Sequence, residues 1–247
     1  MSTPTSQTSP TPRRRPKVVV FDVNETLSDT SPMRRRFTDV GAPGPMFDTW
    51  FAGLLRDGFA LAVAGAARPF ADVGSGLLEV LLSGTAVNRT VVDAVDHIMT
   101  GLTELDVHAD VVDGVTALAQ SGIRLVTLSN GSTDVARTLL GKAGVADKFD
   151  AILSVDDAGR WKPHLDAYRY ALGECNVAPE EAMLVAVHPW DINGARTAGM
   201  ATAWIGRNGG PYPSHFPDPD LTAPSITSLA QMLIDLPDDE AADSTLQ

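Results

Sequence analysis

Four groups of polar residues follow short apolar runs, where a parallel sheet would bring them to one edge. Asp22 follows the first run and Ser129-Asn130 the second, and Lys162 and then Asp191 come after two later runs. Ligands of open parallel sheets bind beyond the carboxyl ends of the strands, so these side chains are predicted to converge. Each has a plainer explanation, since an Asp after a strand often caps a turn and a single Lys is usually a surface residue. Their joint position at one edge favours a functional site.

These residue types fit nucleophilic catalysis by a carboxylate. Asp22, between a buried strand and a turn, can be held rigidly as the nucleophile. Backbone amides of the turn, Ser129 and Lys162 would keep it ionised and stabilise charge on the departing group. Asp191 is then free to hold the lysine or to orient a water molecule.

The elements that must position these residues alternate between strands and helices. The apolar runs that predict strands are Lys17–Phe21, Ile123–Leu128, Ala151–Val155, Met183–Val187 and Ala201–Ile205. Helical periodicity lies between the later runs, at Val135–Ala143, Leu165–Gly173 and Ile192–Ala198. This alternation predicts right-handed crossovers and a parallel sheet covered on both faces.

A second, helical module is predicted between the first strand and the second. From about Ser31 to Asp110 no convincing strand run occurs, and helical patterns lie at Phe47–Ala64 and Val91–Leu102. The predicted fold class is therefore α/β, a Rossmann-like doubly wound parallel sheet core with an inserted helical cap. The predicted divisions are a disordered leader (1–16), the core (17–30 and 111–236), the cap (31–110) and an acidic tail (237–247).

Composition excludes several classes of protein. The net charge of −12 argues against non-specific binding to nucleic acid or to an anionic membrane, because both need a basic surface. No stretch approaches the roughly 18 apolar residues of a membrane helix. The single cysteine, Cys175, cannot form an intramolecular disulfide, and it is expected to be structural, since no basic cluster flanks it. The leader lacks the apolar core of a signal peptide, so a cytoplasmic location is predicted.

The polar groups also match four motifs of a known family. FDVNETLSD (residues 21–29), TLSN (127–130), WKP (161–163) and VHPWDINGA (187–195) resemble the signature motifs of the haloacid dehalogenase superfamily, in order and spacing. The resemblance covers about residues 17–236. It implies that Asp22 is the nucleophile, with Thr26, Ser129, Lys162 and Asp191 as the other catalytic residues.

Within the superfamily the chain resembles the L-2-haloacid dehalogenases. Magnesium-dependent members carry a second Asp two residues after the nucleophile, where this chain has Asn24, which cannot shuttle a proton. Motif four offers one carboxylate, Asp191, where phosphatases usually have an acidic pair. Tyr168 and Trp190 match the dehalogenase pattern. The resemblance implies displacement of halide from a short 2-haloacid through an ester on Asp22, with no metal or organic cofactor, in a homodimer.

Some positions depart from that branch and bear on substrate. Asn24 stands where its members carry Tyr, and Phe51 stands near the place of a cap Arg that helps to hold the halide. His188, in place of an Asn, is either an altered polar contact or a loop residue. Candidate substrate contacts are therefore Asn24, Asn130, Phe51, Tyr168, His188 and Trp190. Phe51 should narrow the pocket and favour haloacetates, and Arg34–Arg36 are either a substitute anchor or a solvated face.

Two other functions remain open from the sequence. A small-molecule phosphatase or phosphonate hydrolase on the same scaffold would require magnesium, and Asn24 argues against it. A catalytically silent binding protein would not need the set Asp22, Ser129, Lys162 and Asp191, which is complete here.

Overall fold

The structure, a computed structural model, describes residues 14–207 and 209–237. Its centre is a six-stranded sheet with the strand order β5-β4-β1-β6-β7-β8. All neighbouring strands of this sheet are parallel. The strands are β1 Val18–Phe21, β4 Arg124–Ser129, β5 Ala151–Ser154, β6 Ala182–Ala186, β7 Ala201–Ile205 and β8 Leu221–Ala223.

Strand β1 lies inside the sheet, between β4 and β6. Helices cover both faces of the sheet, and this is why β1 is an apolar run. Val18 and Val20 belong to one hydrophobic core and Val19 and Phe21 to the other, and all four are fully buried. Side chains alternate between the faces of a strand, so a strand buried on both faces must be apolar throughout. This position holds Asp22 at the carboxyl end of the most enclosed part of the sheet.

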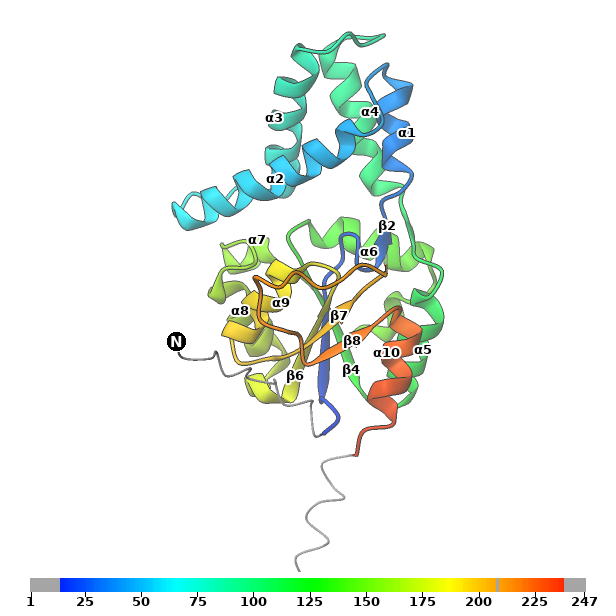
Figure 1. Ribbon diagram of the computed structural model, residues 1–247, viewed down its shortest axis with the longest axis vertical. Helices are drawn as coiled ribbons and strands as arrows, with labels where there is room; N and C mark the ends of the chain where they lie inside the picture. Colours follow the sequence, from blue (N-terminus) through cyan, green and yellow to red (C-terminus); the bar gives the residue numbers. More distant parts are fainter. Residues whose placement is uncertain (1–13, 208, 238–247) are drawn as a thin grey trace, which may run out of the picture.

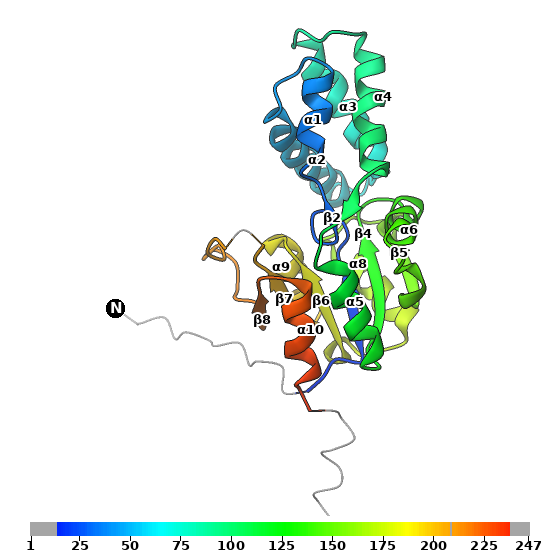
Figure 2. The ribbon, with the colours of Figure 1, turned by 90° about the vertical axis from the view of Figure 1, so that its right-hand side faces the viewer.

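Helices of the core flank the sheet on its two sides (Figures 1 and 2). Helices α5 (Val111–Gln120) and α10 (Ile226–Ile234) pack on each other and share the core of Val19 and Phe21. Helices α8 (Leu165–Cys175) and α9 (Pro189–Thr197) share the core on the other face. The remaining helical segments are α6 Thr133–Lys142, α7 Val155–Ala158 and the 3-10 turns η1 Ala146–Lys148 and η2 Pro179–Glu181.

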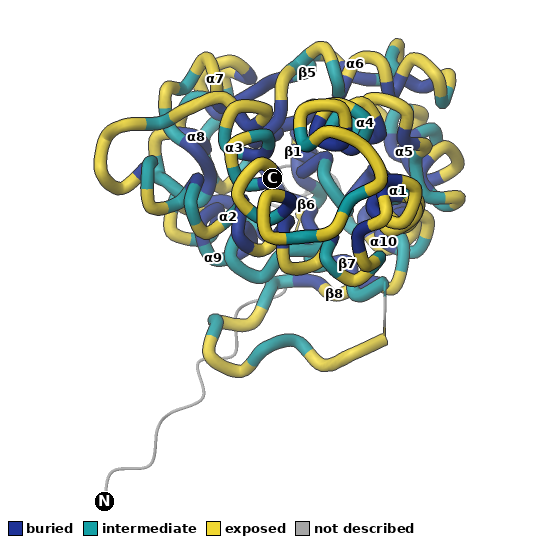
Figure 3. The backbone as a smooth tube through the Cα atoms, turned by 90° about the horizontal axis from the view of Figure 1, so that it is seen from above, coloured by how far each residue is buried: buried dark blue, intermediate teal, exposed yellow. Residues whose placement is uncertain are grey.

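Four helices form a cap that stands on the carboxyl edge of the sheet (Figures 1 and 2). They are α1 Met33–Asp39, α2 Met46–Val63, α3 Phe70–Ser83 and α4 Val91–Thr103. The chain enters the cap through β2 (Ser28–Asp29) and leaves through β3 (Asp106–Val107), which pair antiparallel. Seen from above, the buried residues gather around β1 and β6, and exposed residues lie along the outer turns (Figure 3).

The predicted fold class is confirmed, and the differences concern elements that the sequence pattern did not reveal. Strand β8 was missed because its three residues include an exposed Thr222, so no apolar run marks it. Strand β3 lies in the segment where no strand was expected, because a two-residue pairing that includes the exposed Asp106 leaves no pattern. Helices α1, α3, α5 and α10 were not among the helical segments named from periodicity. The limits 30/31 and 110/111 of the cap stay a prediction.

The predicted leader up to residue 13 and the acidic tail from residue 238 lie outside the described residues. Within residues 14–207 and 209–237, no helix has both the length and the apolar character needed to cross a membrane. Cys175 ends α8 and is buried, and this burial raises the pKa of its thiol, as expected for a structural cysteine.

Candidate active site

Asp22 lies at the carboxyl end of β1, with its backbone N–H donating to Val185 O of the neighbouring strand at 3.0 Å. Its carboxylate is almost completely buried. The Thr26 hydroxyl donates to Asp22 Oδ2 at 2.6 Å, and Lys162 Nζ donates to Oδ1 at 2.8 Å. Thr26 is fixed in turn, because its Oγ1 accepts the Val187 N–H at 3.1 Å. Both carboxylate oxygens are therefore oriented, which is what an aspartate nucleophile requires.

Lys162 is fully buried and bridges two carboxylates. Its ammonium lies 2.8 Å from Asp22 Oδ1 and 2.6 Å from Asp191 Oδ2. Burial alone would lower the pKa of Lys162, but the charges of Asp191 and Asp22 raise it above its ordinary value. Burial alone would raise the pKa of Asp22, but the charges of Lys162 and His188 hold it below its ordinary value. Asp22 is thus kept ionised although water barely reaches it.

Asp191 has both oxygens engaged. Tyr168 donates its phenol proton to Oδ1 at 2.6 Å, and Lys162 donates to Oδ2. Burial raises the pKa of Asp191, and the charge of Asp22 adds to this effect. Close packing fixes Tyr168: a Cβ on Gly194 would lie only 2.3 Å from its Oη. Asp191 and Tyr168 therefore act as a rigid support for Lys162.

The second motif also positions Lys162. The Asn130 side chain accepts the Lys162 backbone N–H at 2.9 Å and donates to the Lys162 carbonyl at 3.3 Å. Ser129 Oγ accepts the Gly131 N–H at 2.9 Å, and Ser154 donates to the Gly131 carbonyl at 2.9 Å. Asn130 was predicted as a substrate contact. Instead, its side-chain amide forms hydrogen bonds with the backbone N–H and carbonyl of Lys162.

His188 lies near Oδ2 of Asp22, the carboxylate oxygen that Lys162 does not bind. Its Nε2 is 3.2 Å from Asn24 O, 3.7 Å from Asp22 Oδ2 and 3.6 Å from Glu25 Oε2. The imidazole stacks on Trp190, with ring centroids 5.0 Å apart. Of the two alternatives left open for His188, the structure favours the polar contact.

The cap contacts the motif loops through aromatic rings. Trp190 meets Phe59 of α2, and Trp161 stacks on Phe70 of α3 at 5.7 Å between centroids. Gly58 makes this approach possible, since a Cβ there would lie 2.1 Å from the Trp161 ring. Trp161 and Trp190, which flank Lys162 and Asp191 in the sequence, thus form part of the contact between the core and the cap.

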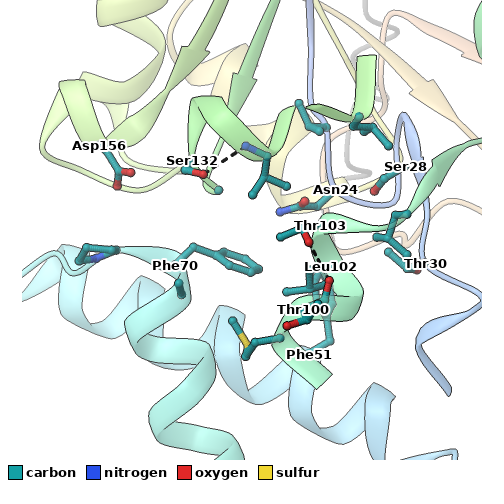
Figure 4. Close-up of a pocket in the computed structure, with 18 residues that line it drawn as sticks. Asn24, Ser28, Thr30, Phe51, Phe70, Thr100, Leu102, Thr103, Ser132 and Asp156 are labelled. Carbon is teal, nitrogen blue, oxygen red and sulfur yellow. Dashed lines mark hydrogen bonds between the residues drawn. The ribbon is translucent and has the colours of Figure 1, made fainter. Parts of the chain in front are cut away.

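A mainly apolar cavity of about 340 Å³ opens between cap and core, beside Val23 and Asn24 of the turn that follows Asp22 (Figure 4). Asn24 and Ser132 reach it from the core, and Phe51 and Phe70 from the cap. Among the described residues, none that lines it is a Lys, Arg or His. Its other lining residues are Val23, Ser28, Thr30, Pro69, Ala71, Met99, Thr100, Leu102, Thr103, Leu105, Gly131, Val135, Leu139 and Asp156.

Phe51 lines this cavity, and the narrowing expected of its ring stays a prediction. The volume lies within the usual range for small-ligand sites, roughly 300–1,000 Å³. Trp50, one residue earlier, is fully buried inside the cap and donates its indole N–H to Gly74 O at 2.9 Å.

The arginines considered as a substitute anchor pair with acids of the cap region. Arg34 binds Asp48, Arg35 lies near Asp39, and Arg36 binds Glu104. None of these arginines lines the apolar cavity. Their charges are balanced by these partners, and Arg34 and Asp48 border a second, polar groove.

A second opening lies on the other side of the turn formed by residues 22–26. This polar groove, of about 860 Å³, is bordered by Glu25, His188, His108 and Arg207 among others. The Asp22–Thr26 turn forms the wall between the two openings, since Asn24 lines the apolar cavity and Glu25 lines the polar groove.

Two residues of the site were missed from the sequence. Arg207 donates to Thr26 O at 2.7 Å and pairs with Asp110 at 2.8 Å, so it holds the turn that carries Thr26. It follows the predicted strand Ala201–Ile205, so the rule of polar residues at strand ends would have found it. Glu25 carried no signal, because its relation to His188 depends on the fold of the turn.

The donor set near Asp22 does not resemble a site for a divalent cation. In the described part of the chain, no cluster of three or more His, Cys, Asp or Glu side chains has a geometry that could hold a metal. The Lys162 ammonium already lies between Asp22 and Asp191, and Asn24 replaces the acid found in magnesium-dependent relatives. These residues do not fit a resident metal ion.

Most of the curated relatives found are dehalogenases, and one is a phosphoserine phosphatase. A model of haloacid dehalogenase-like hydrolases matches residues 16–199. Haloacetate dehalogenase H-2 of Moraxella sp. (strain B) is 33% identical over 124 residues, which are 50% of this chain and 55% of that protein. The chain thus aligns with only about half the length of that relative.

Longer alignments lead to the same group of proteins. (S)-2-haloacid dehalogenase 1 of Pseudomonas sp. (strain CBS-3) is 26% identical over 223 residues, covering 89% of this chain and 97% of that one. The structure of L-2-haloacid dehalogenase from Xanthobacter autotrophicus superposes with a TM-score of 0.80 at 24% identity, over 89% of this chain and 99% of that chain. At this identity, the structural likeness is one of fold.

Proposed function

The chain belongs to the family of haloacid dehalogenase-like hydrolases, and we propose that it hydrolyses the carbon–halogen bond of short 2-haloacids through an ester on Asp22. The observation that carries the proposal is the buried Asp22 carboxylate, held ionised by Lys162 and Thr26 beside an apolar cavity. The names of the relatives above support the substrate class.

In the first step a carboxylate oxygen of Asp22 attacks C2 of the substrate from the side opposite the halogen. A carbon–oxygen bond forms, the carbon–halogen bond breaks with inversion at C2, and halide leaves with the bonding electrons. Asn24 is the amide that lines the cavity beside the nucleophile, and we assign it to the leaving halide. The N-terminus of α6 at Ser132 offers positive dipole charge to the substrate carboxylate.

In the second step water attacks the Asp22 carbonyl carbon, and the 2-hydroxy acid leaves. Thr26 and Lys162 stay within hydrogen-bond reach of the two Asp22 oxygens and stabilise the charge that develops there. Neither step calls for a metal or an organic cofactor.

Phosphoryl transfer on the same scaffold has less support. It would need a proton carrier two residues after the nucleophile, and Asn24 cannot take that part. A silent binding protein would not need the nearly inaccessible ion pair of Asp22 and Lys162, whose burial carries a cost in desolvation. The proposal includes a cytoplasmic homodimer, which rests on the resemblance and on the composition of the chain.

The test is a panel of chloro-, bromo- and fluoroacetate and 2-chloropropionate alongside p-nitrophenyl phosphate with and without Mg²⁺. Halide release from the haloacids, absent in Asp22→Ala, is expected, with no phosphatase activity. A single turnover in ¹⁸O-water should place the label in the Asp22 carboxylate. Label found first in the product would mean direct attack by water and would exclude the ester.

A further inference from the structure

The apolar cavity offers no cationic side chain to an anionic substrate. Among the residues that the structure describes, no Lys, Arg or His lines it. Phe51 and Phe70 line it from the cap, and Val23 and Leu139 line it from the core. Phe51 stands near the position where the family resemblance implies an Arg. Burying a carboxylate among such groups without a partner of opposite charge is costly, so the cavity favours an uncharged ligand.

The charges near the nucleophile also oppose an anion. One ammonium, that of Lys162, lies between the carboxylates of Asp22 and Asp191, so negative charge is in excess at this point. Asp156 adds another carboxylate at the border of the cavity. Like charges repel most strongly where water is largely excluded. A substrate with a carboxylate beside its reacting carbon would bring a further negative charge toward Asp22.

The N-terminus of α6 compensates only in part. A helix N-terminus is equivalent to about half an elementary charge, and its effect falls off within the first turn. Asp134 lies in that turn, and the Ser132 side chain accepts the Val135 N–H at 3.4 Å. Some of the positive end is thus already balanced inside the helix, and less than a full charge is left for a bound carboxylate.

The polar groups that line the cavity suit a neutral polar substrate. The Asn24 side-chain amide both donates and accepts hydrogen bonds, as hydroxyl groups do. Hydroxyls line the cavity at Ser28, Thr30, Thr100, Thr103 and Ser132. A carboxamide has the same double character, with a carbonyl that accepts and N–H groups that donate. It can therefore bind here through hydrogen bonds between uncharged groups.

The cavity also has space along its length for an apolar substituent. Its volume of about 340 Å³ lies within the usual range for small-ligand sites, roughly 300–1,000 Å³. Figure 4 shows Asn24 and Asp156 well apart, with Phe70 between them in this view. With the reacting carbon near Asn24, an alkyl group on the amide nitrogen would extend toward Phe70.

We propose that the site also accepts uncharged 2-halocarboxamides and dehalogenates them with a higher kcat/KM than the corresponding 2-haloacids. The inference rests on the proposed function, because it uses the same ester on Asp22. An Asp22 oxygen bonds to C2, and halide leaves with the bonding electrons. Water then attacks the Asp22 carbonyl carbon and releases the 2-hydroxyamide, and the second water proton goes to solvent. The carbon–nitrogen bond stays intact.

The test compares chloroacetate, chloroacetamide and N-propylchloroacetamide by chloride release in thiol-free buffer. We expect kcat/KM to be roughly 10-fold or more higher for chloroacetamide than for chloroacetate, since one unbalanced charge is removed. The propyl group should raise it further, by about fourfold for each methylene that is buried. Mass spectrometry should find glycolamide as the product of chloroacetamide. Asp22→Ala, which keeps Cys175, measures any chloride released by alkylation of that thiol.

A charge variant and its matched control test the cause of the preference. Phe51→Arg should raise kcat/KM for chloroacetate and leave that for chloroacetamide nearly unchanged. Phe51→Leu, which removes the ring without adding charge, should keep the preference for the amide. An Arg that raises both substrates alike would count against the inference.

The outcomes separate the inference from the proposed function. A wild-type kcat/KM for chloroacetate equal to or above that for chloroacetamide would overturn the inference and leave the proposed function standing. Glycolate formed from chloroacetamide would also count against it, because the amide bond would have been cleaved. Chloride released from the amides alone would support the inference and replace the acids as the substrate class. If no substrate releases chloride and Asp22 gains no mass, the proposed function itself fails.

Discussion

Lys162 Nζ lies 2.8 Å from Asp22 Oδ1, and neither side chain exposes more than 4% of its surface. The same ammonium serves Asp191, so one positive charge offsets two buried carboxylates. Removing one partner of such a group leaves uncompensated charge inside the protein, which costs more than the pair contributes.

Lys162→Met should therefore abolish halide release and reduce the free energy of unfolding by about 3–5 kcal/mol at neutral pH. Without the ammonium, the pKa values of both carboxyls should rise above their unfolded values. Stability contributed by a raised pKa is present at low pH and is lost as the pH increases. Urea unfolding should thus find a smaller deficit at pH 5 than at pH 8. Lys148→Met, at a surface pair with Asp147, is the control. A deficit independent of pH would contradict the assignment.

The alkylation step should tolerate mild acid. The pKa of Asp22 lies below its ordinary 3.8, because the charges of Lys162 and His188 outweigh its burial, so the carboxylate stays ionised as the pH falls toward 5. Single-turnover halide release should therefore keep its rate between pH 7 and pH 5. A rate that falls steeply over this range would argue against an Asp22 held ionised by Lys162.

We predict metal independence, because the Lys162 ammonium already lies between the two carboxylates. After exhaustive chelation, halide release is expected at an unchanged rate, and added Mg²⁺ should not raise it. The measurement is steady-state halide release before and after chelation, with metal content checked by elemental analysis. Activity lost on chelation and restored by magnesium would transfer the protein to the phosphotransferase branch.

Gly194 keeps Tyr168 against Asp191, since a Cβ there would lie 2.3 Å from the Tyr168 Oη. Gly194→Ala should displace the phenol and lower kcat by roughly 10- to 100-fold, the equivalent of one hydrogen bond to a charged group. Gly173→Ala is the matched control, because nothing lies within 4 Å of a Cβ there. Its kcat should be unchanged. Equal kcat values in the two variants would remove Tyr168 from the support of Lys162.

Phe51 offers a test of substrate size. The cavity of about 340 Å³ leaves room for substituents at C2, and apolar contact contributes about 0.8 kcal/mol per buried methylene. We therefore expect kcat/KM to rise from haloacetate to 2-halopropionate and 2-halobutyrate. Phe51→Arg should add a donor and raise kcat/KM for haloacetate by about 10- to 100-fold. A wild-type preference for haloacetate would instead support the narrowing of the pocket that the sequence predicts for Phe51.

The sequence by itself determined the sheet and the family. A parallel strand buried on both faces has to be apolar, so β1 and the later strands were visible as runs, and the polar residues after them marked the site edge. The comparisons confirm the resemblance carried by the four motifs. Strand β8 and the β2–β3 pair were not predicted, because strands of two or three residues are too short to form a recognisable hydrophobic pattern.

Only the tertiary structure decided what each polar residue does. A side chain at a strand end can serve substrate, backbone or a neighbouring charge, and the sequence cannot distinguish these uses. The Asn130 side chain binds the Lys162 backbone, and both carboxylate oxygens of Asp191 accept hydrogen bonds from Tyr168 and Lys162. Glu25 meets His188 only because the turn after β1 passes through a left-handed residue. Such contacts join residues of different elements, 23 or more positions apart, and their distances exist only once the chain has folded.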